Sequence, residues 1–87
     1  MNMNGIMNEV AVVFWMFFLN YPNCLCSLDR GGRYAYLSLF LNDADMKADD
    51  VMLFVKSRCP NGPKMWVNDD PKSHFRVLHI EWEADAD

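Results

Sequence analysis

The sequence predicts an α+β fold: a small antiparallel sheet with one main helix packed on one face, and the elements in the order β-β-β-α-β-β. Two kinds of periodicity predict it. Residues 33–41 and 74–82 alternate between two sets of side chains, which is typical of strands. Residues 48–59 instead place apolar side chains every three or four positions, which is typical of one face of an α-helix.

The composition requires a dense core. Of the 87 residues, 52% are hydrophobic and 14% are aromatic, which excludes a disordered chain. A chain of this length supplies one domain. We expect that domain to span residues 1–87, with frayed ends at 1–6 and 84–87. Three cysteines, an odd number, are too few for a disulfide scaffold and predict a cytoplasmic protein.

Residues 10–19 (VAVVFWMFFL) are apolar throughout. Their β-branched and aromatic side chains favour a first strand that is buried on both faces. A membrane-spanning helix needs about 20 such residues, and no Lys or Arg precedes Arg30 to form an export signal. We therefore expect this segment to lie in the sheet and the protein to have no membrane partner.

Two more strands are expected to complete an antiparallel meander with the first. Residues 24–28 form a short candidate strand, and the two glycines within 29–32 permit a turn. Residues 33–41 then form a longer strand. The alternation along that strand divides its apolar side chains into two sets, with Leu37, Leu39 and Leu41 on one face and Tyr34, Tyr36 and Phe40 on the other.

One helix is expected at 48–59. Residues 42–45 (NDAD) offer caps for its N-terminus. Asp49 and Asp50 favour its first turn because they interact well with the helix dipole. The prolines and glycine within 60–63 end it. Its apolar stripe consists of Ala48, Val51, Met52, Val55 and Cys59.

Two strands are expected after the helix, at 64–67 and 74–82. In the second of these, Leu78, Ile80 and Trp82 share one face. The chain then ends in an acidic segment that suits a solvated tail.

A single helix covers a single face of a sheet, so this arrangement leaves apolar surface uncovered. If the leucines of 33–41 face the helix, the aromatic residues of the same strand point away from it, beside aromatic residues of 10–19. Five half-exposed aromatic side chains would present on the order of 500 Å². The chain's own loops, a second copy of the chain or a different protein could cover this surface.

Five residues have side chains that bind zinc in other proteins. Structural zinc sites usually hold a Cys pair at knuckle spacing, which Cys24-x-Cys26 lacks. His74 and His79 point to opposite faces of one strand. We interpret Cys24, Cys26 and Cys59 as small buried apolar residues. We therefore expect no metal and no cofactor, with a zinc-stabilised structural domain as the alternative.

No arrangement of residues predicts catalysis. The carboxylates at 49–50 and 69–70 suit a helix start and a turn, and no known signature surrounds the cysteines or histidines. We therefore predict that the protein is not an enzyme.

A single-stranded nucleic-acid-binding module is a second hypothesis. Arg30 and Arg33 flank two glycines and precede Tyr34 and Tyr36, and basic and aromatic side chains together suit base stacking. The net charge of −4 argues against this hypothesis, because an acidic surface repels phosphates.

These observations favour a small acidic protein that binds a partner stoichiometrically and inhibits or regulates it. Compact acidic proteins of phages and mobile elements that block host defence nucleases, anti-CRISPR proteins among them, share this size and charge, although no motif supports the analogy. We expect a protein partner with a basic, nucleic-acid-binding surface, and a homodimer is a further option. The candidate binding residues combine carboxylates with aromatic anchors: Asp43, Asp45, Asp49, Asp50, Glu81, Glu83, Tyr34, Tyr36, Phe40 and Trp82.

Overall fold

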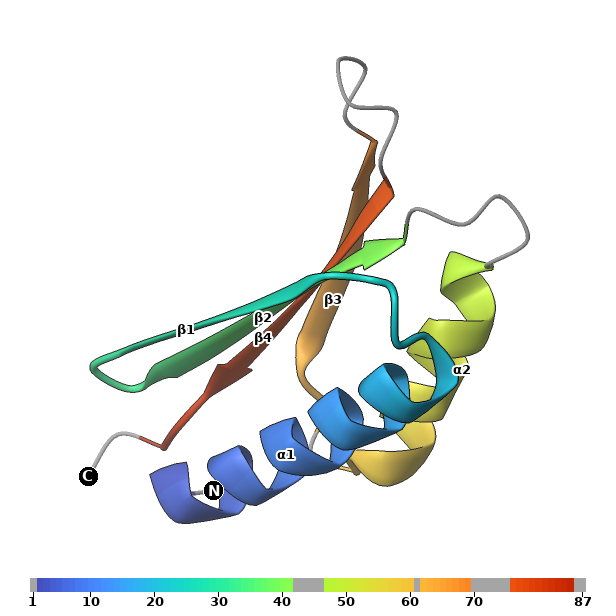
Figure 1. Ribbon diagram of the computed structural model, residues 1–87. Helices are drawn as coiled ribbons and strands as arrows, with labels where there is room; N and C mark the ends of the chain where they lie inside the picture. The colour runs from blue at the N-terminus through green and yellow to red at the C-terminus, as the bar shows by residue number, and fades with distance from the viewer. Residues whose placement is uncertain (1, 42–46, 61, 70–75, 86–87) are drawn as a thin grey trace.

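A helix followed by a pair of antiparallel strands occurs twice along the chain (Figure 1). The computed structural model describes residues 2–41, 47–60, 62–69 and 76–85. The α+β class is confirmed, whereas the expected order β-β-β-α-β-β is wrong at its first element. The elements are α1 (Met3–Asn20), β1 (Cys26–Gly31), β2 (Tyr34–Leu41), α2 (Ala48–Arg58), β3 (Lys64–Asp69) and β4 (Arg76–Glu83).

Residues 10–19, expected to form a strand, lie within α1. The buried apolar side chains of this helix are spaced i, i+4, i+7 and i+11, and they form one stripe against the sheet. A wholly apolar run fits the period of a strand and that of a helix equally well. Its β-branched residues then favoured the strand, which is why the prediction was wrong. Packing on the sheet overrides that local preference. The stripe consists of Ile6, Val10, Val13 and Phe17.

Local hydrogen bonds define both ends of α1. The side-chain oxygen of Asn2 accepts a hydrogen bond from the Gly5 N–H at 2.8 Å, so Asn2 is the N-cap. The Tyr21 N–H donates to the Phe17 carbonyl at 2.8 Å, and Pro22 follows, which prevents continuation of the helix.

In the part of the chain that the structure describes, no helix combines the length and the hydropathy needed to cross a bilayer.

Two residues within the chain ends that we expected to fray are fixed in the fold. Ile6 is 1% exposed near the start of α1. Ala84 is buried, and its N–H donates to the Arg33 carbonyl at 2.7 Å. This last bond extends the pairing of β2 with β4 beyond the end of the strand.

The strands form one antiparallel sheet in the order β1-β2-β4-β3. The register of the two central strands places Leu37 opposite Ile80 and Leu39 opposite Leu78. All four side chains are buried in the core, so the expectation that the leucines of β2 face a helix is confirmed. The expected meander of three strands is reduced to the β1–β2 hairpin, in which Gly32 adopts a φ of 57° at the turn.

The second helix, α2, lies where the sequence predicted it. Its apolar stripe is buried except for Met52, which is half-buried. Lys47 is the N-cap and makes no side-chain capping bond. The caps expected within 42–45 lie outside the described residues. Asp49 and Asp50 occupy the first turn, as predicted.

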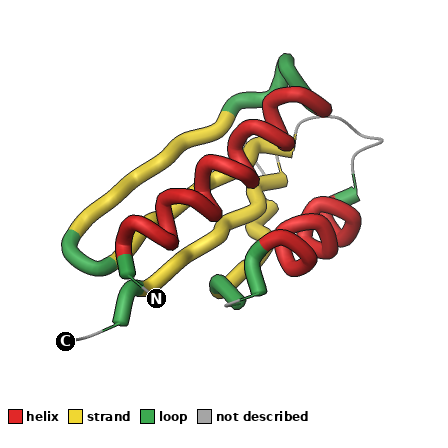
Figure 2. Tube along the Cα trace, turned by 90° about the horizontal axis from the view of Figure 1, so that it is seen from below, coloured by secondary structure: helices red, strands yellow, loops and turns green. Residues whose placement is uncertain are grey.

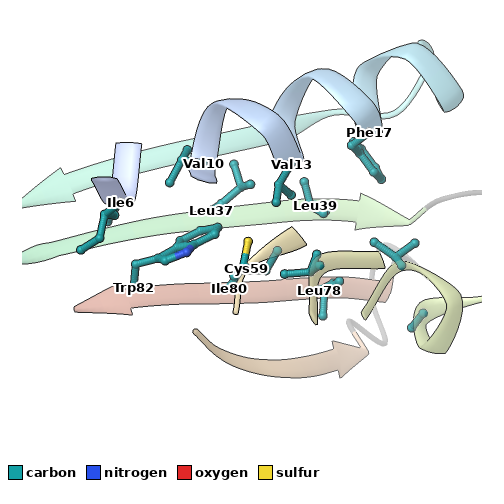
Figure 3. Packing of buried hydrophobic residues seen from close by; sticks show 14 of the residues in the cluster. Ile6, Val10, Val13, Phe17, Leu37, Leu39, Cys59, Leu78, Ile80 and Trp82 are labelled. Carbon is teal, nitrogen blue, oxygen red and sulfur yellow. The ribbon is translucent and has the colours of Figure 1, made fainter. Parts of the chain in front are cut away.

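Both helices pack on the same side of the sheet and share one apolar core (Figures 1 and 2). Figure 3 shows the α1 side chains directed onto those of β2 and β4. Trp82 lies in this core and is 2% exposed. Its expected role as an exposed anchor for a partner is therefore wrong, because α1 covers the face of β4 from which it projects.

One acidic side chain is buried beside this core. Glu9 is 8% exposed, and neither its carboxylate oxygens nor Nε1 of Trp82 has a hydrogen-bond partner of regular geometry. Burial raises the pKa of Glu9, although the nearby Trp82 side chain opposes part of this shift. Burial and the Glu9 charge together raise the pKa of the Cys59 thiol to about 11. Ionised Glu9 therefore destabilises the folded state.

Two adjacent valines test the orientation of α1. Val13 is 1% exposed and Val12 is 44% exposed. We expect Val13→Ala to lower the free energy of unfolding by about 2 kcal/mol, because it removes buried methyl groups and leaves a cavity. Val12→Ala should change it by less than about 0.5 kcal/mol. Urea denaturation at low micromolar protein measures both, and equal losses would contradict the described packing.

Glu9→Gln tests the buried carboxylate. The pKa of Glu9 is higher in the folded state than its ordinary value of 4.5. The protonated carboxyl group therefore contributes its full stabilisation below pH 4.5, and this contribution is lost as the pH rises through the folded-state pKa. We expect Glu9→Gln to exceed the wild type in stability at pH 8 by on the order of 1 kcal/mol, or roughly 4–8 °C in Tm.

The difference in Tm between the wild type and Glu9→Gln should shrink as the pH is lowered toward 4.5. Calorimetry across this range measures it, and Glu83→Gln, at an exposed carboxylate of β4, is the matched control. A difference that is the same at every pH would show that the ionisation of Glu9 does not act on the fold.

Candidate protein-binding surface

Over the part of the chain that the structure describes, no helix packs on the other side of the sheet, which we call the open face. Its central residues belong to β2 and alternate with the buried leucines of that strand. The strand register extends the open face into four rows of neighbours: Gly31, Tyr34 and Glu83; Asp29, Tyr36, Glu81 and Lys64; Ser27, Ser38, His79 and Trp66; Phe40, Val77 and Asn68.

Three half-buried rings, Tyr36, Trp66 and His79, meet on the open face and form what we call the aromatic cluster. The rings of Trp66 and His79 stack with centroids 5.3 Å apart and planes inclined by 21°, and Tyr36 meets Trp66 edge-on at 5.7 Å. The hydroxyl oxygens of Tyr36 and Ser38 lie 3.0 and 3.3 Å from Nδ1 of His79. Burial lowers the pKa of His79, which favours an uncharged cluster at neutral pH.

Carboxylates border the aromatic cluster on the side of the β1–β2 turn. Asp29 of β1 and Glu81 of β4 are the cross-strand neighbours of Tyr36. Glu83 accepts a hydrogen bond from the Tyr34 hydroxyl at 3.3 Å. Among the described strand residues, the only cation at an open-face position is Lys64, opposite Glu81. Three carboxylates and one ammonium group therefore give this face a negative charge.

Two shallow depressions lie at the same end of the sheet. The first has a volume of about 450 Å³ and is lined by the β1–β2 hairpin, including Asp29, Arg30 and Tyr34. The second has a volume of about 340 Å³ and includes Glu81 and Glu83 in its lining. In the first depression the charges of Asp29 and Arg30 oppose each other. In the second, three carboxylates outnumber Lys64, so this depression suits a cationic side chain better than an anionic group.

The structure brings together half of the predicted binding residues. Asp49 and Asp50 are exposed in the first turn of α2, on the helix side of the sheet, and so lie apart from the carboxylates of β4. Trp82 is buried, as described above. Asp43 and Asp45 lie outside the described residues. The residues that share the open face are Tyr34, Tyr36, Phe40, Glu81 and Glu83.

The open face exposes less apolar surface than the sequence predicted. Tyr34 is 42% exposed, while Tyr36 and Phe40 are half-buried. The aromatic residues of 10–19, which we expected beside them, belong instead to α1 on the other side of the sheet. Exposed large apolar side chains do exist, and α1 carries four of them: Val12, Trp15, Phe18 and Leu19.

Sequence reasoning missed Trp66 and Asp29. Trp66 lay in a segment recognised only as a short strand, and Asp29 was assigned to a turn, whereas β1 extends through it. Alternation along β3 indicates that Trp66 shares a face with Lys64. It does not reveal that this face meets His79, because the pairing of β3 with β4 depends on the sheet as a whole.

The cysteines considered as zinc ligands are distributed along the fold. Cys24 and Cys26 are half-buried near the start of β1, and Cys59 is buried after α2. Burial raises the pKa of Cys26 and Cys59, which favours protonated thiols that pack as small apolar side chains. Among the residues placed by the structure, no three His, Cys, Asp or Glu side chains gather as a metal site. His74 is not among them.

Comparison of the chain with protein-family models, curated proteins and solved structures finds no match. The charge and packing of the open face are therefore the basis for assigning a function.

The lowered pKa of His79 can be tested by titration. We expect its midpoint to lie below 6.5, the ordinary pKa of histidine, because burial favours the neutral ring. Trp66→Ala removes the stacked indole and should raise the midpoint toward 6.5. The lowered pKa also predicts that stability is lost as the pH falls from 6.5 through the folded-state value.

NMR titration of the His79 ring protons measures this midpoint. Leu53→Ala, at an exposed site on α2, is the control and should leave it unchanged. A midpoint that does not move in Trp66→Ala would show that the indole does not shield the imidazole.

Proposed function

We propose that this protein is a small inhibitor or regulator that binds a partner protein through the open face, and that the partner contributes a Lys/Arg-rich segment. The observation that carries the proposal is the position of Asp29, Glu81 and Glu83 around the aromatic cluster, on a sheet face without a covering helix. The proposed action is occupancy of the partner's surface.

Two kinds of contact support a cationic ligand. A guanidinium or ammonium group is attracted to the faces of Tyr and Trp rings, and this contact is worth about 0.5–1 kcal/mol at exposed sites. Carboxylates at the border form charge-assisted hydrogen bonds, and Arg can bind one of them through two parallel bonds. The aromatic cluster and its acidic border would thus hold the stem and the charged end of the same side chain.

The aromatic cluster also resembles, in its chemistry, the stacking platforms of proteins that bind single-stranded nucleic acid. The charge of the open face decides between these two ligands. Phosphates brought to this sheet would meet three carboxylates and one lysine, so stacking would be opposed by electrostatic repulsion. A basic segment of a nucleic-acid-binding protein is attracted by the same charges.

In this proposal the protein competes with nucleic acid for the basic surface of its partner. Electrostatic attraction would speed the encounter, and the aromatic cluster would contribute contacts that salt does not screen. The sign and position of the charges, rather than their number, make the surface suitable for this competition. The odd number of cysteines is consistent with the cytoplasm as the compartment of action.

A labelled peptide of alternating Arg and Gly residues is the probe for this proposal. We expect it to bind the wild-type protein in a salt-dependent manner. Reversing the two β4 carboxylates, Glu81→Lys with Glu83→Lys, should weaken binding at least about tenfold, the equivalent of 1.4 kcal/mol. Fluorescence anisotropy measures the affinity.

The matched control is Asp49→Lys with Asp50→Lys, which changes the net charge equally but on α2. It should weaken peptide binding less than about threefold, because exposed charges farther apart than about 10 Å are screened at 0.1 M salt. Equal losses in the two double variants would refute a localised site. Binding of a labelled single-stranded oligonucleotide that is lost in Arg30→Ala with Arg33→Ala would favour the nucleic-acid-binding alternative.

A further inference from the structure

Helix α1 carries a second apolar stripe on the side that faces away from the sheet, which we call the outer stripe. Its four large side chains are well exposed: Val12 at 44%, Trp15 at 57%, Phe18 at 46% and Leu19 at 68%. Val12, Trp15 and Leu19 follow the spacing i, i+3 and i+7, as residues on one helix face do. A surface helix of a monomer normally shows polar residues on this side.

The rings of the outer stripe are already arranged against one another. Trp15 and Phe18 meet edge-on with centroids 6.0 Å apart, and Phe18 stacks on the half-buried Phe14 at 6.4 Å. These contacts limit the motion of the side chains before any partner binds, which lowers the entropic cost of association. The outer stripe is therefore a preformed surface.

The charges of α1 restrict what can cover the outer stripe. The helix contains no Lys or Arg, and its single acidic residue, Glu9, is buried on the opposite side. A charged partner would lose solvation here without gaining an opposite charge. An anionic lipid surface would find none of the basic residues that usually accompany such a helix. The suitable occupant is another neutral apolar helix, and a second copy of α1 is one.

The order of side chains along the stripe fits a second copy in antiparallel orientation. A two-fold axis beside Trp15 places Val12 against Phe18 of the second copy, and Ala11 against Leu19. The smaller side chains lie N-terminal to Trp15 and the larger ones lie C-terminal to it. Antiparallel pairing therefore sets small against large residues along the whole contact, as in well-packed helix pairs.

The area is sufficient for a modest dimer. A fully exposed aromatic side chain presents about 150–250 Å², so the exposed fractions above correspond to roughly 400 Å² on each copy. Two copies would bury about 800 Å² from these side chains, and Ala11 and Phe14 beside them bring the total toward the ~1,000 Å² of a specific interface.

We propose that this chain forms a symmetric dimer through antiparallel packing of α1 on α1 of a second copy. The outer stripe and the open face lie on opposite sides of each subunit. The dimer therefore turns both open faces outward, away from the contact. If the proposed function holds, the dimer can engage two basic segments at once, but dimerisation itself does not depend on that function.

Sedimentation velocity from 1 to 200 µM protein, without any peptide, tests the dimer. We expect a monomer–dimer equilibrium in the micromolar range. Trp15→Ala should weaken it at least about 30-fold, as for a central aromatic residue of an interface. Leu53→Ala removes an equally exposed residue of α2 and should leave the equilibrium unchanged. Circular dichroism confirms that each variant is folded.

A charge pair tests the orientation. Val12→Glu and Phe18→Lys should each abolish the dimer, while the double variant should restore it, because the antiparallel arrangement brings Glu and Lys together twice. A wild-type protein that stays monomeric at 200 µM would overturn the proposal, as would a folded double variant that fails to dimerise. Flotation of a monomeric wild type with phosphatidylglycerol vesicles, lost in Trp15→Ala, would overturn it in favour of a lipid surface.

Discussion

The packing of α1 across the two central strands is the contact on which the rest of the structure depends. A chain of 87 residues buries only about 60–65% of its surface on folding, so few apolar residues can be left out of the core. The stripe from Ile6 to Phe17 covers the leucines of β2 and the apolar residues of β4, including Trp82. It thereby determines which side of the sheet stays available for binding.

That single contact separates two surfaces of different chemistry. The open face combines stacked rings with carboxylates, and it suits a charged partner whose attraction depends on salt. The outer stripe of α1 is neutral and apolar, and it suits a like surface whose association depends on buried area. Because the sheet and α1 lie between them, each surface can be occupied without blocking the other.

Glu9 shows that the core is not optimised for stability alone. Its carboxylate is buried without a regular hydrogen bond beside Trp82 and Cys59, at the contact that holds α1 on the sheet. An apolar residue of similar size would stabilise this contact more. Cys59 has the opposite character, since its thiol stays protonated and packs as a small apolar side chain.

Sequence alone determined the α+β class, the second helix, and the bounds of β1 to β4 to within a few residues. It also determined the division of β2 into a leucine face and an aromatic face. Each of these segments shows contrast between apolar and polar positions, and that contrast reveals the period of the element. Residues 10–19 lack that contrast, so a strand and a helix fitted them equally. Only the tertiary structure decided for a helix, by supplying a sheet for one side of it. That decision buried Trp82 and placed Trp15 and Phe18 on the outer side of α1 rather than on the sheet. The pairing of β3 with β4, which only the assembled sheet determines, brought Trp66 to His79.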